Sequence, residues 1–248
     1  MKLATWNVAM PLSARRRAAI RTYLDAQQAD VWVLTETHEA LTPGYAFSHS
    51  SANGCDGTSH KEQHWVTIWS RYPLERLETS DRERTAAVRV TPDSGDCFVI
   101  YGTVLPWRGS AWRGHPSREG VAFREALAVQ TADWRQIMVD FSEDELFVIG
   151  DLNQAMAGPP HYYGSLANRA KLEAALSEAK LVALTAGTGD PVRRDSPPCA
   201  CIDHICARRD SSWRARTAVR WPKAAVPPPA LSDHFGISIL FDRDSIRS

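Results

Sequence analysis

LFVIGDLN, residues 146–153, joins a short apolar run to a carboxylate and an amide. A continuous apolar run of this length is typical of a strand that is buried on both faces of a sheet. The side chains that follow such a strand, here Asp151 and Asn153, point into a shared rim where active sites collect. An Asp after a strand is on its own usually a turn residue or a helix cap. The meaning of Asp151 therefore depends on what the other strand ends carry.

Four further apolar runs carry polar residues at one end or within them. Asn7 closes residues 2–8 (KLATWNV), Glu36 follows 31–35 (VWVLT), Asp203 and His204 lie within 201–207 (CIDHICA), and Asp233 and His234 precede 235–241 (FGISILF). This joint pattern is much rarer by chance than any one of its members. Hard oxygen donors with few thiolates select Mg²⁺, Mn²⁺ or Ca²⁺ over Zn²⁺. We therefore predict a site for Mg²⁺, with Mn²⁺ as the alternative.

The remaining pattern predicts further strands and three helices. Strands are expected at 64–70, 85–91, 97–105, 181–184 and 213–221, and helices from Ser13 to about Gln28 and over 118–139 and 167–179. The turn PDSGD (92–96) joins 85–91 and 97–105 into a hairpin. Ser13 can cap the first helix, with Ala18 among its candidate core residues. Many strands with few helices favour an α/β sandwich over a βαβ barrel. With no linker or repeat, residues 1–248 are expected to form a single domain.

The charge of the chain is balanced, with 29 Lys and Arg against 29 Asp and Glu. Balance of this kind excludes a strongly basic protein that binds nucleic acid nonspecifically, although it allows a local basic patch. The start of the chain, MKLATWNVAMPL, shows no signal peptide, and no stretch is long enough to span a bilayer. Five cysteines, an odd number, favour reduced thiols. We expect a cytoplasmic protein that does not associate with membranes.

The cysteines near His204 raise the alternative of a zinc site. Cys199, Cys201 and Cys206 lack the C-x₂-C spacing of a structural zinc site. Alternation along a strand puts Cys201 and Asp203 on one face and His204 and Cys206 on the other. Ordinary buried or loop thiols are therefore the expectation.

Six short motifs, taken in order, resemble the endonuclease/exonuclease/phosphatase superfamily. They are TWNV (5–8), VLTET (33–37), SRYPL (70–74), GDLN (150–153), IDHI (202–205) and SDHFGI (232–237). The superfamily includes apurinic/apyrimidinic endonucleases and pancreatic-type deoxyribonucleases, and GD-x-N followed by SDH is the strongest part of the similarity. The resemblance implies a four-layer α/β sandwich of two packed mixed β-sheets flanked by α-helices.

The resemblance also implies a metal-binding half of the site. Glu36 would be the principal Mg²⁺ ligand, with Asp233 at or near the same ion. Asn7 would lie beside it and help to hold the metal or the phosphate.

The catalytic residues follow from the same resemblance. Asp151 would position and deprotonate the attacking water, and Asn153 would donate to a phosphate oxygen. His234 would contact the scissile phosphate, and Asp203 would orient its imidazole. A carboxylate on one ring nitrogen fixes the tautomer and raises the basicity of the other nitrogen.

One position departs from the family pattern. Thr103 stands where family members carry a His or Tyr that binds the phosphate or protonates the leaving group. A threonine hydroxyl can donate a hydrogen bond but is a poor acid. A metal-bound water, Arg108, His115 or His64 could replace it. KEQH (61–64) weakly resembles a segment of pancreatic-type deoxyribonucleases in which a glutamate, here Glu62, supports an acid histidine that this sequence lacks. We expect Glu62 and His64 to be surface residues.

Two Trp-Arg-Gly units lie in LPWRGSAWRGHPSRE (105–119). Either the segment binds substrate, with tryptophan stacked on a base and arginine on phosphate, or its tryptophans pack on the domain. Trp107 and Arg108 are the expected contacts, because they directly follow a strand.

The sequence predicts a metal-dependent phosphodiesterase or nuclease that acts on nucleic acid as a monomer, without an obligate protein partner. A phosphatase or phosphodiesterase of a small molecule or lipid headgroup is the first alternative. A catalytically weak member that binds nucleic acid or protein is the second.

Overall fold

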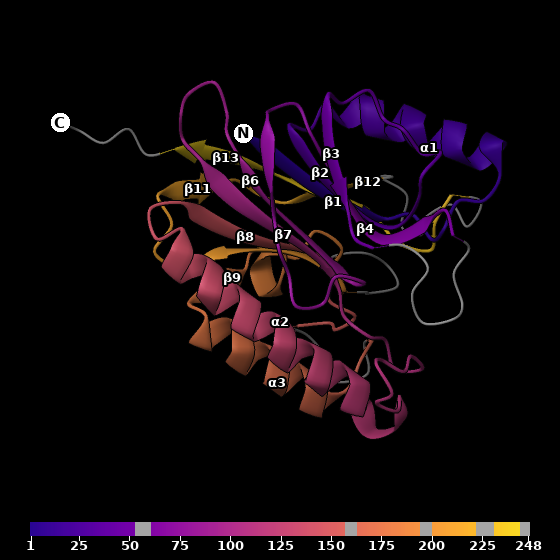
Figure 1. Cartoon of the computed structure of the whole chain (residues 1–248), viewed down its shortest axis with the longest axis vertical. Helices are drawn as coiled ribbons and strands as arrows, with labels where there is room; N and C mark the ends of the chain where they lie inside the picture. Colours follow the sequence, from indigo (N-terminus) through magenta and orange to yellow (C-terminus); the bar gives the residue numbers. More distant parts are fainter. Residues whose placement is uncertain (53–60, 157–162, 194–199, 222–230, 244–248) are drawn as a thin grey trace.

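Two mixed β-sheets pack face to face in the computed structural model (Figure 1), which describes residues 1–52, 61–156, 163–193, 200–221 and 231–243. The first sheet has the order β11-β13-β1-β2-β4-β3, and β12 also pairs with β13. Its strands are β1 (Lys2–Asn7), β2 (Val31–His38), β3 (Phe47–Ser50), β4 (Gln63–Ser70), β11 (Trp213–Ala215), β12 (Val219–Trp221) and β13 (Gly236–Arg243).

The second sheet has the order β5-β6-β7-β8-β10-β9. Its strands are β5 (Leu74–Leu77), β6 (Thr85–Val90), β7 (Phe98–Val104), β8 (Glu145–Asp151), β9 (Leu181–Ala183) and β10 (Asp203–Arg208). The predicted hairpin is confirmed, because β6 and β7 pair antiparallel. In contrast, β7 and β8 pair parallel, and the long helix α2 makes the crossover between them.

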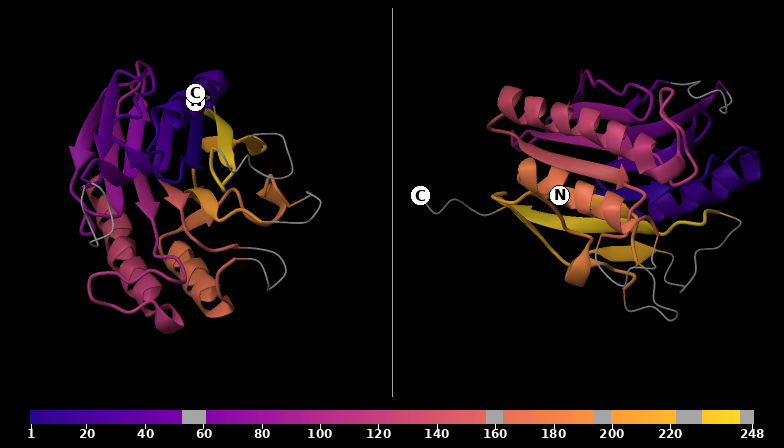
Figure 2. Two further views of the ribbon diagram at one scale, coloured as in Figure 1. Left: turned by 90° about the vertical axis from the view of Figure 1, so that its right-hand side faces the viewer. Right: turned by 90° about the horizontal axis from the view of Figure 1, so that it is seen from below.

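Helices cover the outer faces of both sheets, which gives four layers (Figure 2). Helix α1 (Ala14–Gln27) packs Ile20 and Leu24 against Trp6 and Trp32 of the first sheet. Helices α2 (Val121–Asp140) and α3 (Leu166–Glu178) lie over the second sheet. A short 3₁₀ turn, Arg118–Gly120, precedes α2, and a second one, Gly187–Gly189, follows β9. The predicted α/β sandwich is therefore confirmed. No helix in the described ranges has an apolar stretch long enough to cross a bilayer.

The inner faces of the two sheets share one apolar core. Val33 and Val66 of the first sheet belong to the same cluster as Ile100 and Ile149 of the second. Because side chains alternate along a strand, Val148 points the other way, into the layer beneath α2 and α3. Strands buried on both faces explain why their sequences are continuous apolar runs.

Three local expectations were wrong. Strands β3 (FSHS) and β5 (LERL) were not anticipated, because they are short, polar and largely exposed edge strands. The segment 213–221 forms two strands and not one. Ala215 pairs with Phe241 and Val219 pairs with Ser238, so this side has one residue more than β13 between the two pairs. A β-bulge therefore interrupts the pairing with β13. Ala18 was expected in the core, but it lies on the exposed side of α1.

Gly102 of β7 lets the two sheets approach closely. A Cβ atom at this position would lie 2.6 Å from Val66 Cγ1 and 3.0 Å from Val33 Cγ1, both in the opposite sheet. Since these valines are fully buried, they have little room to move away.

We expect Gly102→Ala to lower the free energy of unfolding by about 1–3 kcal/mol, because the added methyl overpacks the core. The Gly102→Ala/Val66→Ala double variant should be more stable than the sum of the two single changes predicts, since the smaller side chain makes room. Urea unfolding measures all three variants. Gly44→Ala is the control, as nothing lies within 4 Å of a Cβ there; strict additivity of the double variant would contradict the close approach.

Candidate functional site

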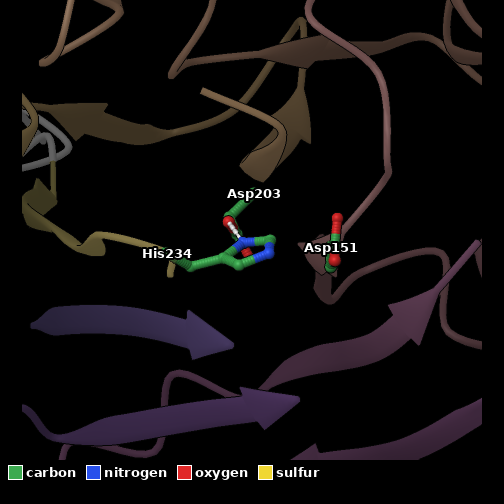
Figure 3. A group of neighbouring side chains, drawn as sticks. All are labelled: Asp151, Asp203 and His234. Atoms are coloured by element: carbon green, nitrogen blue, oxygen red, sulfur yellow. Dashed lines mark hydrogen bonds and ion pairs between the residues drawn. The ribbon is translucent and has the colours of Figure 1, made fainter. Parts of the chain in front are cut away.

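The polar strand ends converge at one end of the sandwich. Asn7 ends β1, and Glu36 lies near the end of β2, which runs parallel to β1. In the second sheet Asp151 ends β8 and pairs directly with Asp203, the first residue of the antiparallel strand β10. The topology therefore brings side chains from both sheets to the same rim. Figure 3 shows Asp151 and Asp203 together with His234, which arrives from the turn before β13.

The side-chain amide of Asn7 connects the two sheets. Its Nδ2 donates to Glu36 Oε1 and to Asp151 Oδ2, both at 3.0 Å. Its Oδ1 accepts from the backbone N–H of Ala9 at 2.9 Å, which fixes the orientation of the amide. Both protons of the amide group thus point at carboxylates, and its oxygen points away from them.

A strained turn holds Asp151 in place. Asp151 Oδ1 accepts from the backbone N–H of Asn153 at 2.9 Å, and Asn153 has a left-handed backbone (φ 51°) that asparagine tolerates. Asn153 Nδ2 donates to the carbonyl of Leu105 at 2.9 Å. Gly150 has φ 143°, and a Cβ there would lie 2.0 Å from the carbonyl oxygen of Thr103. The GDLN sequence therefore meets the conformational needs of this turn.

His234 is held by Asp203 and by the end of β1. Its Nδ1 lies 2.6 Å from Asp203 Oδ2. The hydroxyl of Ser232 donates to the carbonyl of Asn7 at 2.6 Å and accepts from the backbone N–H of His234 at 3.0 Å. The indole of Trp6 donates to the carbonyl of His234 at 3.0 Å. The serine of the SDH motif thus has a plain role, which is to fasten this turn to β1.

Burial and close neighbours shift the pKa values of the acidic groups and the histidine in the site. Burial, followed by the nearby carboxylate of Asp203, raises the pKa of Asp151 to about 8. Burial also raises the pKa of Glu36, with Asp233 and Asp203 adding to the effect. Burial alone would lower the pKa of the His234 imidazole, but Asp203, then Asp151 and Asp233, raise it to about 10. At neutral pH His234 is therefore a largely buried imidazolium held by the Asp203 carboxylate.

Asp233 lies at the exposed rim of this cluster, and Thr103 faces away from it. The side chain of Asp233 is 79% exposed, and its Oδ1 is 4.0 Å from His234 Nε2. Thr103 is fully buried on the α2 side of its sheet, where its hydroxyl donates to Gln130 Oε1 at 2.6 Å. Its hydroxyl therefore faces α2, away from the carboxylates of the other sheet.

His64, another candidate for the leaving-group acid, also has partners. His64 Nδ1 lies 2.7 Å from the carbonyl of Ser51, and its Nε2 lies 3.5 Å from Glu39. Glu62 pairs with His38 and not with His64, at 3.3 Å. His64 is half-buried and not a surface residue, whereas the carboxylate of Glu62 is exposed.

The two Trp-Arg-Gly units have different surroundings. Trp112 is buried and its indole donates to Asp81 Oδ2 at 3.1 Å. Trp107 is 38% exposed. Trp107 and Arg108 line a cavity of about 590 Å³.

The zinc alternative gains no support from the described residues. Cys201 donates to Asp190 Oδ1 at 3.1 Å. His204 Nε2 lies 2.9 Å from the carbonyl of Gln154. Burial raises the pKa of the Cys206 thiol to about 12, which opposes the thiolate that a metal needs. Cys199 lies outside the described residues.

Two residues near the site were missed from the sequence. Arg16 of α1 donates to the carbonyls of Val8, Ala9 and Leu231, so it clamps the turn before β13 to the end of β1. Tyr163 is half-exposed, and burial, then Asp151, Asp233 and Glu36, raise the pKa of its phenol. In the sequence, Arg16 is marked only as a basic residue shortly after the helix cap Ser13. No sequence motif marks Tyr163.

Comparison with known proteins identifies the family of the chain and supports its fold. A model described as the Endonuclease/Exonuclease/phosphatase family matches residues 4–234. AP endonuclease LMAP from Leishmania major superposes with a TM-score of 0.72 at 14% identity, over 98% of this chain and 88% of that one. A 3′ phosphatase from Neisseria, NExo, bound to a product DNA hairpin, gives 0.68 at 19% identity, over 98% and 99%.

A third similar structure is an AP endonuclease from Archaeoglobus fulgidus. Its TM-score is 0.66 at 18% identity, over 98% of this chain and 99% of that one. At these identities the solved structures support the fold. No curated protein matches the chain by sequence.

We expect Asp203→Asn to lower the pKa of the His234 imidazole by several units, because burial then acts with less opposition. The wild-type ring should stay protonated from pH 6 to pH 9, whereas the variant ring should titrate near or below the ordinary value of about 6.5. NMR titration of the histidine ring signals measures both.

The same pair has a pH-dependent effect on stability. A histidine whose pKa is raised on folding stabilises the fold fully below its unfolded pKa of about 6.5 and loses that effect as pH rises through about 10. The stability difference between the wild type and Asp203→Asn should therefore shrink over that interval. A difference that grows with pH would contradict the ion pair.

Proposed function

The chain belongs to the endonuclease/exonuclease/phosphatase family, and from this membership and the site we propose a magnesium-dependent phosphodiesterase that cleaves nucleic acid. The observation that carries the proposal is the convergence of Glu36, Asp151 and Asp203 from two sheets around one amide and one imidazolium. Grouping buried carboxylates in this way lowers the stability of the fold. A protein that only binds nucleic acid or another protein would not need such a group.

The donor set fits a hard divalent cation. Oxygens of Asp151 and Asp203 lie with His234 in a group whose facing atoms are all within 4.8 Å of one another. Asp203 Oδ1 is buried and has no hydrogen-bond partner among the described residues. His234 is not a ligand in this set, because its Nδ1 pairs with Asp203 and an imidazolium has no lone pair to offer a metal. The oxygens that remain, together with those of Glu36, which Asn7 links to Asp151, suit Mg²⁺ and also Mn²⁺.

We assign Glu36 as the principal Mg²⁺ ligand, with Asp233 as a second carboxylate that can turn toward it from the surface. Asn7 orients Glu36 by donating to it, because its own oxygen faces Ala9. A cation held here would neutralise charge on the phosphoryl oxygens. It would also offset the mutual repulsion of Glu36, Asp233 and Asp203 that raises the pKa of Glu36.

Asp151 is the proposed base that deprotonates the attacking water. Its raised pKa makes its carboxylate a stronger base than an exposed one. Two donated hydrogen bonds, from Asn7 and Asn153, fix the direction of its oxygens. His234, charged and held by Asp203, is the proposed donor to the scissile phosphate.

Tyr163 is the proposed donor to the leaving oxygen, in place of Thr103. Its backbone carbonyl accepts from the N–H of Ala155 at 3.1 Å, two residues past Asn153, which holds the tyrosine beside the turn of the site. A phenol is protonated at neutral pH and can therefore donate a hydrogen bond. The hydroxyl of Thr103 is already donated to Gln130 on the other side of the sheet. A phenol from a different loop can thus supply the hydrogen bond that the strand does not.

Nucleic acid is favoured over a small phosphomonoester because the site opens beside an aromatic and basic cavity. Trp107 and Arg108 line it, and such pairs suit a base and a phosphate. The similar structures include AP endonucleases and a DNA 3′ phosphatase, which supports a nucleic-acid substrate.

We expect hydrolysis of bis(p-nitrophenyl) phosphate and of labelled oligonucleotides to require Mg²⁺ and to stop with EDTA. Asp151→Asn should lower kcat by about 10²- to 10⁴-fold, the usual contribution of a general base. Initial rates from absorbance and gel electrophoresis measure both effects.

Asp242→Asn is the matched control, because it removes one carboxylate from an exposed surface pair with Arg216. Its activity should equal that of the wild type. Hydrolysis that persists in EDTA, or a preference for monoesters alone, would falsify the proposal.

A further inference from the structure

A cavity of about 590 Å³ lies between the loop after β7 and the beginnings of α2 and α3. Its polar and aromatic lining combines the first Trp-Arg-Gly unit with both helix starts. The lining residues used below are Trp107, Arg108, Arg118, Glu119, Gln154 and Asn168. We call this cavity the helix-start groove.

The groove adjoins the proposed site through two backbone connections. Gln154, in its wall, directly follows the turn that carries Asp151 and Asn153. Leu105, two residues before Trp107 of the opposite wall, donates its backbone N–H to the carbonyl of Asp151 at 2.9 Å. A ligand in the groove therefore lies next to the residues proposed to act on the phosphate.

Trp107 is a fixed aromatic surface in this groove. One side of its indole lies against Trp65, with ring centroids 5.8 Å apart, and against Arg84, whose Cζ is 5.5 Å from the ring centroid. Arg84 is itself held, because its guanidinium lies 4.2 Å from the Trp65 ring and donates to Ser110 Oγ at 2.8 Å. Since 38% of Trp107 remains exposed, the ring is positioned before any ligand arrives and can stack on a base without reordering.

The other end of the groove favours an anion. Arg108 and Arg118 face it with one carboxylate, Glu119, so the side chains of the lining have a formal net charge of +1. The starts of α2 and α3, at Gly120 and at Ser165–Asn168, also line it. The two helices run side by side with these starts at the same end (Figure 1). Their positive backbone dipole ends add to the attraction.

We propose that the helix-start groove binds the nucleotide next to the scissile phosphate, with its base on Trp107 and its phosphate at Arg108 and Arg118. This inference rests on the proposed function and narrows it to a substrate class. The nucleotide must be both unstacked and unpaired, because the Trp107 ring needs a free base face and a groove of this size has room for one base without its partner. The volume suits one small ligand, whereas a duplex needs far more room. The substrate is therefore a single strand or a strand with an unpaired end.

The test measures binding of a fluorescein-labelled single-stranded DNA hexamer by fluorescence polarisation. Six further hexamers each lack one base, and every protein carries Asp151→Asn with Mg²⁺ present, the probes being recovered intact. We expect Trp107→Ala to weaken binding of the intact hexamer about tenfold, as loss of one stacked base does. Trp107→Phe should weaken it less, and it preserves the fold if the alanine variant does not.

The decisive result is coupling between Trp107 and one position of the strand. At that position, removal of the base should weaken binding to the tryptophan protein about tenfold and barely affect Trp107→Ala. Equal effects of every abasic position on both proteins overturn the inference. Binding of AMP as tight as that of the hexamer also overturns it, because the groove would then serve a free nucleotide.

A charge test is independent of the tryptophan. The Arg108→Gln/Arg118→Gln variant should lower the slope of log Kd against log salt by about 1 to 1.5, as loss of two phosphate contacts on a single strand does. Arg15→Gln/Arg21→Gln, on the exposed side of α1, removes the same charge elsewhere and should leave the slope unchanged. Equal slopes for the two double variants would contradict a phosphate at the groove.

Failure of this inference can be distinguished from failure of the proposed function. Hydrolysis of bis(p-nitrophenyl) phosphate by the wild type needs no second nucleotide. If that hydrolysis requires Mg²⁺ and no coupling to Trp107 is found, the groove alone is excluded. If no phosphodiester is hydrolysed, the proposed function fails whatever the hexamers show.

Discussion

The amide of Asn7, donating at once to Glu36 and Asp151, is the contact on which the site depends. These two carboxylates come from different sheets, and in a poorly solvated pocket they would repel each other. A neutral donor between them reduces that repulsion and sets their separation, while the N–H of Ala9 prevents the amide from turning over. An aspartate in place of Asn7 would add a third charge, and a serine could not reach both neighbours.

Much of the fold follows from short-range pattern, and the parts that do not are those decided by distant contacts. The buried strands at 31–35 and 146–150 are apolar throughout because both faces are covered, so composition alone marks them. The edge strands β3 and β5 carry no such mark, since their pairing to β4 and β6 supplies most of their order. The bulge between β11 and β12 depends on the register of β13, which lies some twenty residues further along the chain.

The site divides in the same way. Residues that close apolar strands, such as Asn7 and Asp151, could be found from sequence, because a strand end fixes where its last side chain lies. The direction of Thr103 could not, because it depends on which face of β7 meets α2. The two Trp-Arg-Gly units are alike in sequence, yet Trp112 is buried and donates to the buried carboxylate of Asp81, whereas Trp107 is partly exposed. Arg16 was missed because its partners, the carbonyls of Val8, Ala9 and Leu231, carry no sequence signal at all.

The position of β1 between β2 and β13 has a consequence for how the chain acquires its structure. Lys2 of β1 pairs with Leu240 of β13, so the sheet around β1 cannot be completed until β13 has been synthesised. During synthesis on a ribosome, β1 and β2 can pair early, but one edge of β1 stays unsatisfied until β13 emerges. Contacts this far apart slow folding and expose a strand edge to aggregation in the meantime. The candidate site is completed by the same late event, because the turn that carries Asp233 and His234 leads into β13.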